Sequence, residues 1–258
     1  MAKIKRNNDH IKTEIDGNIL RLTLNRPDKK NALTLKMYSD MAQAIEDADK
    51  TSKIRVVFLS SSSDCFCSGN DLMDFMAFSQ KGASEQSNPF LSALCHTQTP
   101  IVAAVGGPAI GIGATMLLHC DLVYAGQSAR FKLPFVNLGL CPEAGSSYLL
   151  PAMVGYQRAA RLILLGESIS AKEAFDFGIV SAVVADNKLI SFAWQKACQL
   201  TKLPPESVRL SKSLLKKAFR DILDQTIADE IHHFTKRLQT SEFEEAVTAF
   251  FEKRKPKF

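Results

Sequence analysis

One acidic side chain stands alone in the stretch LGLCPEAGSS, which runs from Leu138 to Ser147. No cationic residue lies close to Glu143 in the sequence, so its charge has two interpretations. Pro142 followed by Glu143 suits the first turn of a helix, where a carboxylate meets the positive end of the helix dipole. Alternatively, a carboxylate in a poorly hydrated pocket can take up a proton near neutral pH, which is general acid–base chemistry. Taken by itself, the stretch favours the helix start.

Two glycine-containing loops could bind a developing negative charge. In FCSGNDL the chain turns at Gly69 and enters a helix near Asp71, and in GGPAIGIGAT a glycine-rich turn opens a helix near Ile112 or Gly113. Each loop leaves unpaired backbone N–H groups at a helix N-terminus. If the loops converge, the N–H groups of Asn70 and Ile112 would hold one carbonyl oxygen as it becomes an enolate, with each donor worth roughly 3–4 kcal/mol. Each loop alone is equally compatible with an ordinary glycine turn.

The elements that must position these residues alternate along the chain. IKTEIDGNILRLTLNRPD predicts two strands joined at an Asp-Gly turn, and the next helix is expected to begin after Thr34. Strand, glycine-containing loop and helix then repeat as far as about residue 190, which favours parallel strands and an α/β fold class. From Ser191 onward the pattern is helical. We therefore predict a catalytic core over residues 1–190 and a C-terminal helical region over residues 191–258.

Composition narrows the class of protein. The chain has 258 residues, of which 46% are hydrophobic and 23% charged, as is typical of globular domains. A net charge of +5, with no stretch that interleaves basic and aromatic residues, argues against nucleic acid as a partner. The six cysteines form no C-x-x-C pair and no ligand pattern with the five histidines, so we expect no metal site and a reducing compartment. No apolar run approaches the roughly 20 residues of a membrane helix, and the charged start MAKIKRNNDHIK does not resemble a signal peptide. We expect a cytoplasmic protein with no membrane partner.

Five segments, in this order and spacing, resemble one known family. They are NRPDKKNAL, FCSGNDL, AAVGGPAIGIGATMLLHCDLVYA, LGLCPEAGSS and LLGESISAKEAFDFGIVSAVV, and the resemblance runs from about Ile11 to the helical tail. The family is the crotonase, or enoyl-CoA hydratase/isomerase, superfamily. The resemblance implies a spiral of repeated ββα units and C-terminal helices that build a homotrimer or a hexamer made of two trimers. It also implies an acyl-CoA thioester substrate held in a two-loop oxyanion hole.

By position, the family's two oxyanion donors fall on Asn70 and Ile112. The family usually has glycine at the second position, so the Ile112 side chain must point away from the thioester. The resemblance also implies a site for the CoA portion of the substrate. Its residues are Arg26, Lys29 and Lys30, which would meet the phosphates, and Ser68, Gly69, Asp71 and Leu72, which would line the path of the adenine and pantetheine. CoA enters as part of the substrate, so no separate cofactor is implied.

The acid–base residues distinguish the reactions of this family. Hydratases that resemble this chain use two glutamates, and their positions are occupied here by Thr115 and Phe135. Efficient hydration is therefore disfavoured. An acid at Glu143 is instead similar to the peroxisomal-type Δ3,Δ2-enoyl-CoA isomerases, which implies that Glu143 is the catalytic base of an isomerisation in fatty-acid β-oxidation. Three alternatives stay open: an isomerase of ring-derived CoA thioesters, a weak hydratase, and a non-catalytic module that binds acyl-CoA.

Overall fold

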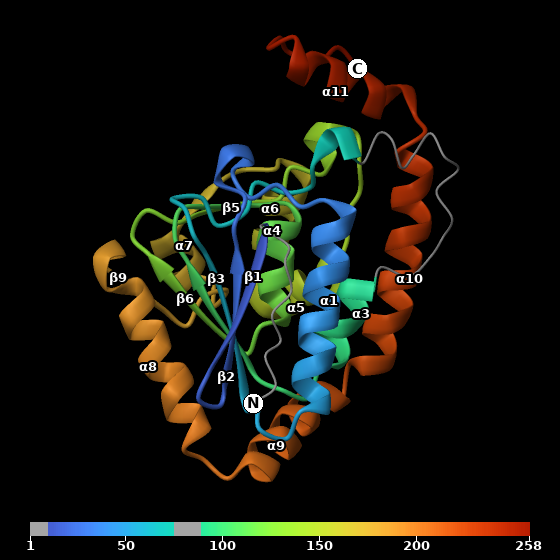
Figure 1. The fold of residues 1–258 in the computed structure, drawn as a ribbon. Coiled ribbons are helices and arrows are strands. Elements are labelled where there is room, and N and C mark those ends of the chain that lie inside the picture. The colour runs from blue at the N-terminus through green and yellow to red at the C-terminus, as the bar shows by residue number, and fades with distance from the viewer. Residues whose placement is uncertain (1–9, 75–88) are drawn as a thin grey trace.

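The computed structural model describes residues 10–74 and 89–258 (Figure 1). The chain begins with the expected hairpin of β1 (Ile11–Asp16) and β2 (Ile19–Leu24), which pair antiparallel. Gly17 makes the turn with a left-handed φ of 61°, a backbone conformation that costs glycine little. The helix α1 (Leu35–Lys50) follows, and the Thr34 hydroxyl accepts a hydrogen bond from the Met37 N–H as its N-cap.

The main sheet continues from the hairpin through parallel strands. Within the described residues it has six strands in the order β1-β2-β3-β4-β6-β9, and every pair from β2 onward is parallel. The later strands are β3 (Val56–Ser61), β4 (Ile101–Val105), β6 (Leu122–Gly126) and β9 (Ala182–Val184). A second sheet contains β5 (Pro108–Ile110), β7 (Arg130–Lys132) and β8 (Ile169–Ser170), in the order β5-β7-β8. The predicted α/β class with parallel strands is confirmed.

Alternate residues of the main sheet pack on opposite faces. On β3, Val57 and Leu59 belong to the larger core cluster, whereas Phe58 belongs to a second cluster on the other face. The second cluster is covered by α8 (Leu189–Thr201), and Figure 1 shows α8 and α1 on opposite sides of the sheet. This burial of both faces explains the continuous apolar runs of the strands.

The remaining helices surround the larger cluster and build the C-terminal region. They are α3 (Pro89–His96), α4 (Ile112–Thr115), α5 (Ser146–Val154), α6 (Tyr156–Leu164), α7 (Ala171–Asp176), α9 (Pro205–Lys217), α10 (Arg220–Arg237) and α11 (Ser241–Phe251). Short 3₁₀ segments are η1 (Pro27–Lys29), η2 (Met116–His119), η3 (Val136–Leu138) and η4 (Asp186–Lys188). In Figure 1, α10 lies beside α3, and α11 lies beyond the end of α10.

The C-terminal helices are tied to the core by buried polar contacts as well as by packing. The buried Lys212 of α9 donates through Nζ to the Thr99 carbonyl oxygen and to Asp121 Oδ2, each at 2.8 Å. Among the residues that the structure describes, no helix is long and apolar enough to cross a membrane.

Candidate active site

The two glycine-containing loops meet in space. Cys67 forms an isolated parallel bridge with Ala109: the Cys67 N–H donates to Pro108 O at 3.1 Å, and the Ile110 N–H donates to Cys67 O at 2.9 Å. The backbone of Gly113 packs tightly against this bridge, because a Cβ on Gly113 would lie 2.6 Å from the Cys67 carbonyl oxygen. Glycine is therefore required there for the loops to approach one another.

Each loop has a backbone N–H without an acceptor among the described residues, at the position expected for an oxyanion donor. The Leu33 N–H donates to Gly69 O, and Leu33 O accepts from the Asp71 N–H. The N–H of Asn70, which lies between these two residues, therefore points away from Leu33. Ile112 is the first residue of α4 and follows Gly111, whose φ is +55°. In residues 10–74 and 89–258, neither the Asn70 N–H nor the Ile112 N–H has an acceptor. The Ile112 side chain is buried in the larger core cluster, as an oxyanion donor at this position requires.

The Asn70 side chain is held by α1. The buried Tyr38 hydroxyl donates to Asn70 Oδ1 at 2.5 Å. Burial, together with the nearby Glu143, raises the pKa of the Tyr38 hydroxyl well above its usual value, so the phenol stays protonated as a donor. The sequence offered no signal for this contact, since Tyr38 has the spacing of an ordinary core residue of the helix.

Glu143 precedes α5 rather than starting it. The helix begins at Ser146, and the two residues before it, Ala144 and Gly145, both have a left-handed φ, of 59° and 69°. The interpretation of Pro142-Glu143 as a helix start is therefore wrong. The Glu143 side chain is turned into the protein and is only 8% exposed.

Burial dominates the acid–base behaviour of Glu143. It raises the pKa of the carboxyl to about 8, while a hydrogen bond from Thr115 lowers it and the charge of Glu230 raises it further. The Thr115 hydroxyl donates to Glu143 Oε1 at 2.5 Å. Thr115 thus occupies one carboxyl oxygen and leaves Oε2 for other chemistry. A carboxyl with this pKa exchanges a proton readily near neutral pH.

A buried histidine fixes the loop that carries Glu143. His119 Nε2 lies 2.7 Å from the Ala144 carbonyl oxygen, which can only accept, so Nε2 carries the proton. Burial lowers the pKa of His119 to about 4, so the ring is neutral and Nδ1 accepts from the Cys95 thiol at 3.6 Å. His119 therefore supports the backbone of the Glu143 loop. Sequence reasoning missed this role because His119 lies in an apolar stretch.

The two segments expected to bind CoA also come together. The Ser68 N–H donates to Lys30 O at 3.1 Å, and the side chains of Lys29 and Lys30 are exposed. Arg26 differs from the expectation of a cation free for phosphate. Its guanidinium donates to Asp71 Oδ2 at 2.7 Å and to Ala32 O at 3.0 Å, and its side chain is 13% exposed. Arg26 and Asp71 thus join the segment from Arg26 to Ala32 to the loop that carries Asn70, since a charge-assisted bond fixes both partners.

The other expected CoA-site residues lie on the same loop. Gly69 is buried, and Ser68 and Leu72 are partly buried. In the part of the chain that the structure describes, no three histidine, cysteine or acidic side chains are grouped as metal ligands.

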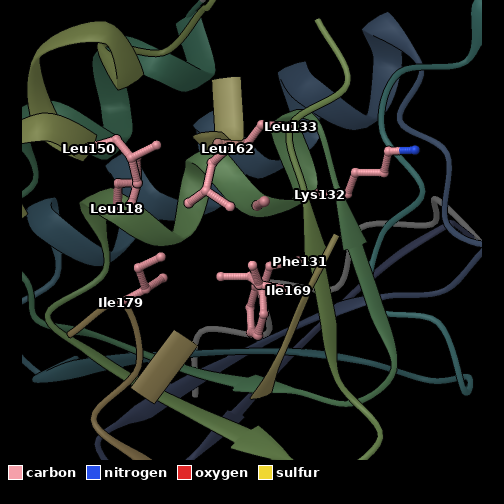
Figure 2. Close-up of a pocket in the computed structure, with 9 residues that line it drawn as sticks. Leu118, Phe131, Lys132, Leu133, Leu150, Leu162, Ile169 and Ile179 are labelled. Carbon is pink, nitrogen blue, oxygen red and sulfur yellow. The ribbon is translucent and has the colours of Figure 1, made fainter. Parts of the chain in front are cut away.

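An apolar cavity borders the helix that carries Thr115. Its lining residues are Ala114, Leu118, Phe131, Lys132, Leu133, Leu150, Leu162, Ile169 and Ile179. Figure 2 shows that the Lys132 ammonium extends away from the apolar side chains. Ala114, which lines this cavity, directly precedes Thr115 in α4.

Comparisons with known proteins identify the family of this chain. The family model for enoyl-CoA hydratase/isomerase matches residues 14–258. Enoyl-CoA delta isomerase 2 of Rattus norvegicus is 36% identical over 249 residues, which are 94% of this chain and 63% of the rat protein. This chain therefore spans less than two thirds of that relative's length. The 1,2-epoxyphenylacetyl-CoA isomerase of Escherichia coli K12 is 32% identical over 97% of this chain and 98% of the relative.

A crystal structure of an enoyl-CoA hydratase/isomerase from Pseudoalteromonas atlantica has a TM-score of 0.91 and 41% sequence identity, and the match covers 96% of this chain and 99% of the other. The α/β spiral with C-terminal helices is thus confirmed. The chain belongs to the enoyl-CoA hydratase/isomerase, or crotonase, family, and the relatives compared above are named for reactions of CoA thioesters.

Proposed function

We propose that this protein is a Δ3,Δ2-enoyl-CoA isomerase and that Glu143 is its base. The observation that carries the proposal is the buried Glu143 carboxyl, which is bonded through Oε1 to the Thr115 hydroxyl and whose pKa is raised by burial to about 8. Moving a double bond by one position needs one group that can take a proton and give it back. A carboxyl with a pKa near neutrality suits both halves of that task.

The reaction follows from the positions of these groups. Glu143 Oε2 removes a proton from C2 of a 3-enoyl thioester, and the electrons of that C–H bond move into a dienolate. The N–H groups of Asn70 and Ile112 stabilise the charge that develops on the thioester oxygen. Glu143 then returns the proton to C4, which leaves the double bond between C2 and C3. The carboxyl ends the cycle ionised, as it began.

Hydration is less well supported by the same residues. Adding water across the double bond calls for a group that activates water as well as one that manages the proton. Thr115 has no acidic function, and its hydroxyl is already bonded to Glu143. The carboxyl of Glu230 is occupied by the Gly145 and Ser147 N–H groups, at 2.6 and 2.8 Å, so it is not free to bind water.

The same proposal includes the CoA site, the roles of the two regions of the chain, and the compartment. Lys29 and Lys30 would meet the CoA phosphates, and the segment from Ser68 to Leu72 would line the remaining CoA path. The core of residues 1–190 would carry catalysis, and residues 191–258 would build a homotrimer or a dimer of trimers. A 2-enoyl thioester would be passed to fatty-acid β-oxidation in the cytoplasm.

One observation favours a second candidate substrate. The Escherichia coli relative that matches along 98% of its own length is named as a 1,2-epoxyphenylacetyl-CoA isomerase. A ring-derived CoA thioester is therefore the alternative substrate, with Glu143 and the two N–H groups in the same roles.

A side-by-side assay tests the proposed function. We expect the wild-type protein to convert a 3-enoyl-CoA into the conjugated 2-enoyl-CoA, which is followed by its ultraviolet absorbance. Hydration of crotonyl-CoA should be at least about 100-fold slower, because Thr115 supplies no second acid–base group. Crotonyl-CoA turnover as fast as isomerisation would contradict the proposal. Turnover of a ring-derived thioester alone would favour the second candidate.

A further inference from the structure

The C-terminal helix α10 packs directly on the loop that carries Glu143. A Cβ on Gly145 would lie 2.3 Å from Leu223 Cδ1 and 3.3 Å from Ile227 Cγ1, both on α10. The left-handed φ of Gly145 and this close approach both require glycine. A helix of the C-terminal region thus packs against the loop that carries Glu143.

One carboxylate of α10 accepts three hydrogen bonds from this loop. Glu230 Oε2 accepts from the Gly145 N–H at 2.6 Å. Glu230 Oε1 accepts from the Ser147 N–H at 2.8 Å and from the Ser147 hydroxyl at 2.5 Å. Glu230 is only 7% exposed, and a buried carboxylate with three donors is firmly held. The contacts begin two residues after Glu143.

The two buried carboxyls differ in how they are supported. Glu230 has three donors, whereas Glu143 has the Thr115 hydroxyl alone among the described residues. Donors stabilise the charged form, so Glu230 is the carboxyl that ionises first. Burial raises the pKa of Glu230, and the bonds from Ser147 and Gly145 oppose that rise. The charge of Glu230 in turn disfavours the loss of the Glu143 proton.

Some of the other titratable groups around this pair stay neutral near pH 7. The rest are charged and bond to partners of their own. Burial raises the pKa of Cys67 and Cys95 to about 12 and that of Cys141 to about 11. Tyr38 and His119 are neutral, as described above. The charged groups nearby are Lys216, which bonds to His119 O, Arg237, which bonds to Gly139 O, and Asp224, which bonds to His96.

We propose that Glu230 is a positioning residue of the reaction: from α10 it holds the Glu143 loop in place and keeps a second buried negative charge near the base. The inference rests on the proposed function, because it assigns to Glu230 an effect on Glu143 as the base. Through Glu230, the C-terminal helical region takes part in the chemistry as well as in packing.

The test compares Glu230→Gln with Asp229→Asn, which removes the same charge from the neighbouring, exposed position of α10. The Glu143 carboxyl is titrated by NMR of the ¹³C-labelled glutamate carboxyls and assigned with Glu143→Gln. We expect Glu230→Gln to lower the pKa of Glu143 by on the order of one unit and to shift the acidic limb of the kcat/KM profile equally. We also expect its kcat to fall about tenfold, since the loop loses a charged acceptor. Asp229→Asn should change neither quantity.

Two results would overturn the inference. One is an unshifted Glu143 titration in folded Glu230→Gln, and the other is an equal shift in Asp229→Asn. If Glu230→Gln does not fold, Ser147→Ala removes one of the three bonds from an exposed position and should lower kcat several-fold. An unchanged kcat in that variant would also count against Glu230. The NMR titration needs no turnover, so a failure of the isomerase assay is separable from a failure of this inference.

Discussion

Glu143→Gln is expected to slow the turnover of a 3-enoyl-CoA by about 10³-fold, since general acid–base catalysis contributes 10²–10⁴-fold. Gln keeps the size of the side chain and an oxygen that can accept from Thr115 Oγ1, so the loop should keep its shape. It cannot take up a proton from C2. Binding of an unreactive acyl-CoA should be unchanged, because the substitution removes a step of the reaction and no contact to CoA.

The matched control is Glu206→Gln, the same change at an exposed position at the start of α9. Its kcat should equal that of the wild type. The kcat values of the wild type, Glu143→Gln and Glu206→Gln are compared by steady-state kinetics at one pH. A Glu143→Gln variant with a kcat within tenfold of the wild type would mean that another group removes the proton.

Glu143→Gln is also expected to stabilise the protein at high pH. The pKa of Glu143 is about 8 in the folded chain against an ordinary value of 4.5. A raised carboxyl pKa leaves stability intact below the lower value and reduces it as pH rises toward the higher one. Since each unit is worth about 1.4 kcal/mol, the wild type should lose about 2–5 kcal/mol between pH 4.5 and pH 9 through this residue. Gln carries no charge and avoids that loss.

Urea unfolding of wild type and Glu143→Gln at pH 5 and pH 9, at one protein concentration, measures this effect. The difference in the free energy of unfolding should be small at pH 5 and should grow to several kcal/mol at pH 9, with the variant the more stable. Glu206→Gln should show no such growth. The same difference at both pH values would mean that the Glu143 carboxyl is hydrated in the folded protein.

Local features of the fold could be predicted from the sequence because they depend on neighbouring residues. The hairpin turn at Gly17 and the cap at Thr34 each involve residues a few positions apart. Such signals are strong in any context. The convergence of the two glycine-containing loops was implied by the resemblance, and the structure adds the bridge between Cys67 and Ala109 that joins them.

Contacts between distant residues could not be predicted in this way. The start of α5 at Ser146 depends on two left-handed residues that are held by His119 and by Glu230, which is 85 positions from Gly145. Arg26 looked like a free cation because its partner, Asp71, lies 45 positions away. Each of these side chains has an ordinary local sequence, and only the folded chain brings its partner to it.

In the proposed reaction, the buried Glu143 carboxyl carries a proton from C2 to C4. The most direct measurement is a single turnover of a 3-enoyl-CoA deuterated at C2, with the position of deuterium in the product read by NMR. Because Glu143 is only 8% exposed, its proton should exchange slowly with water while substrate covers it. We expect deuterium at C4 of the 2-enoyl product. A product with hydrogen from water alone at C4 would contradict the single-carboxyl shuttle.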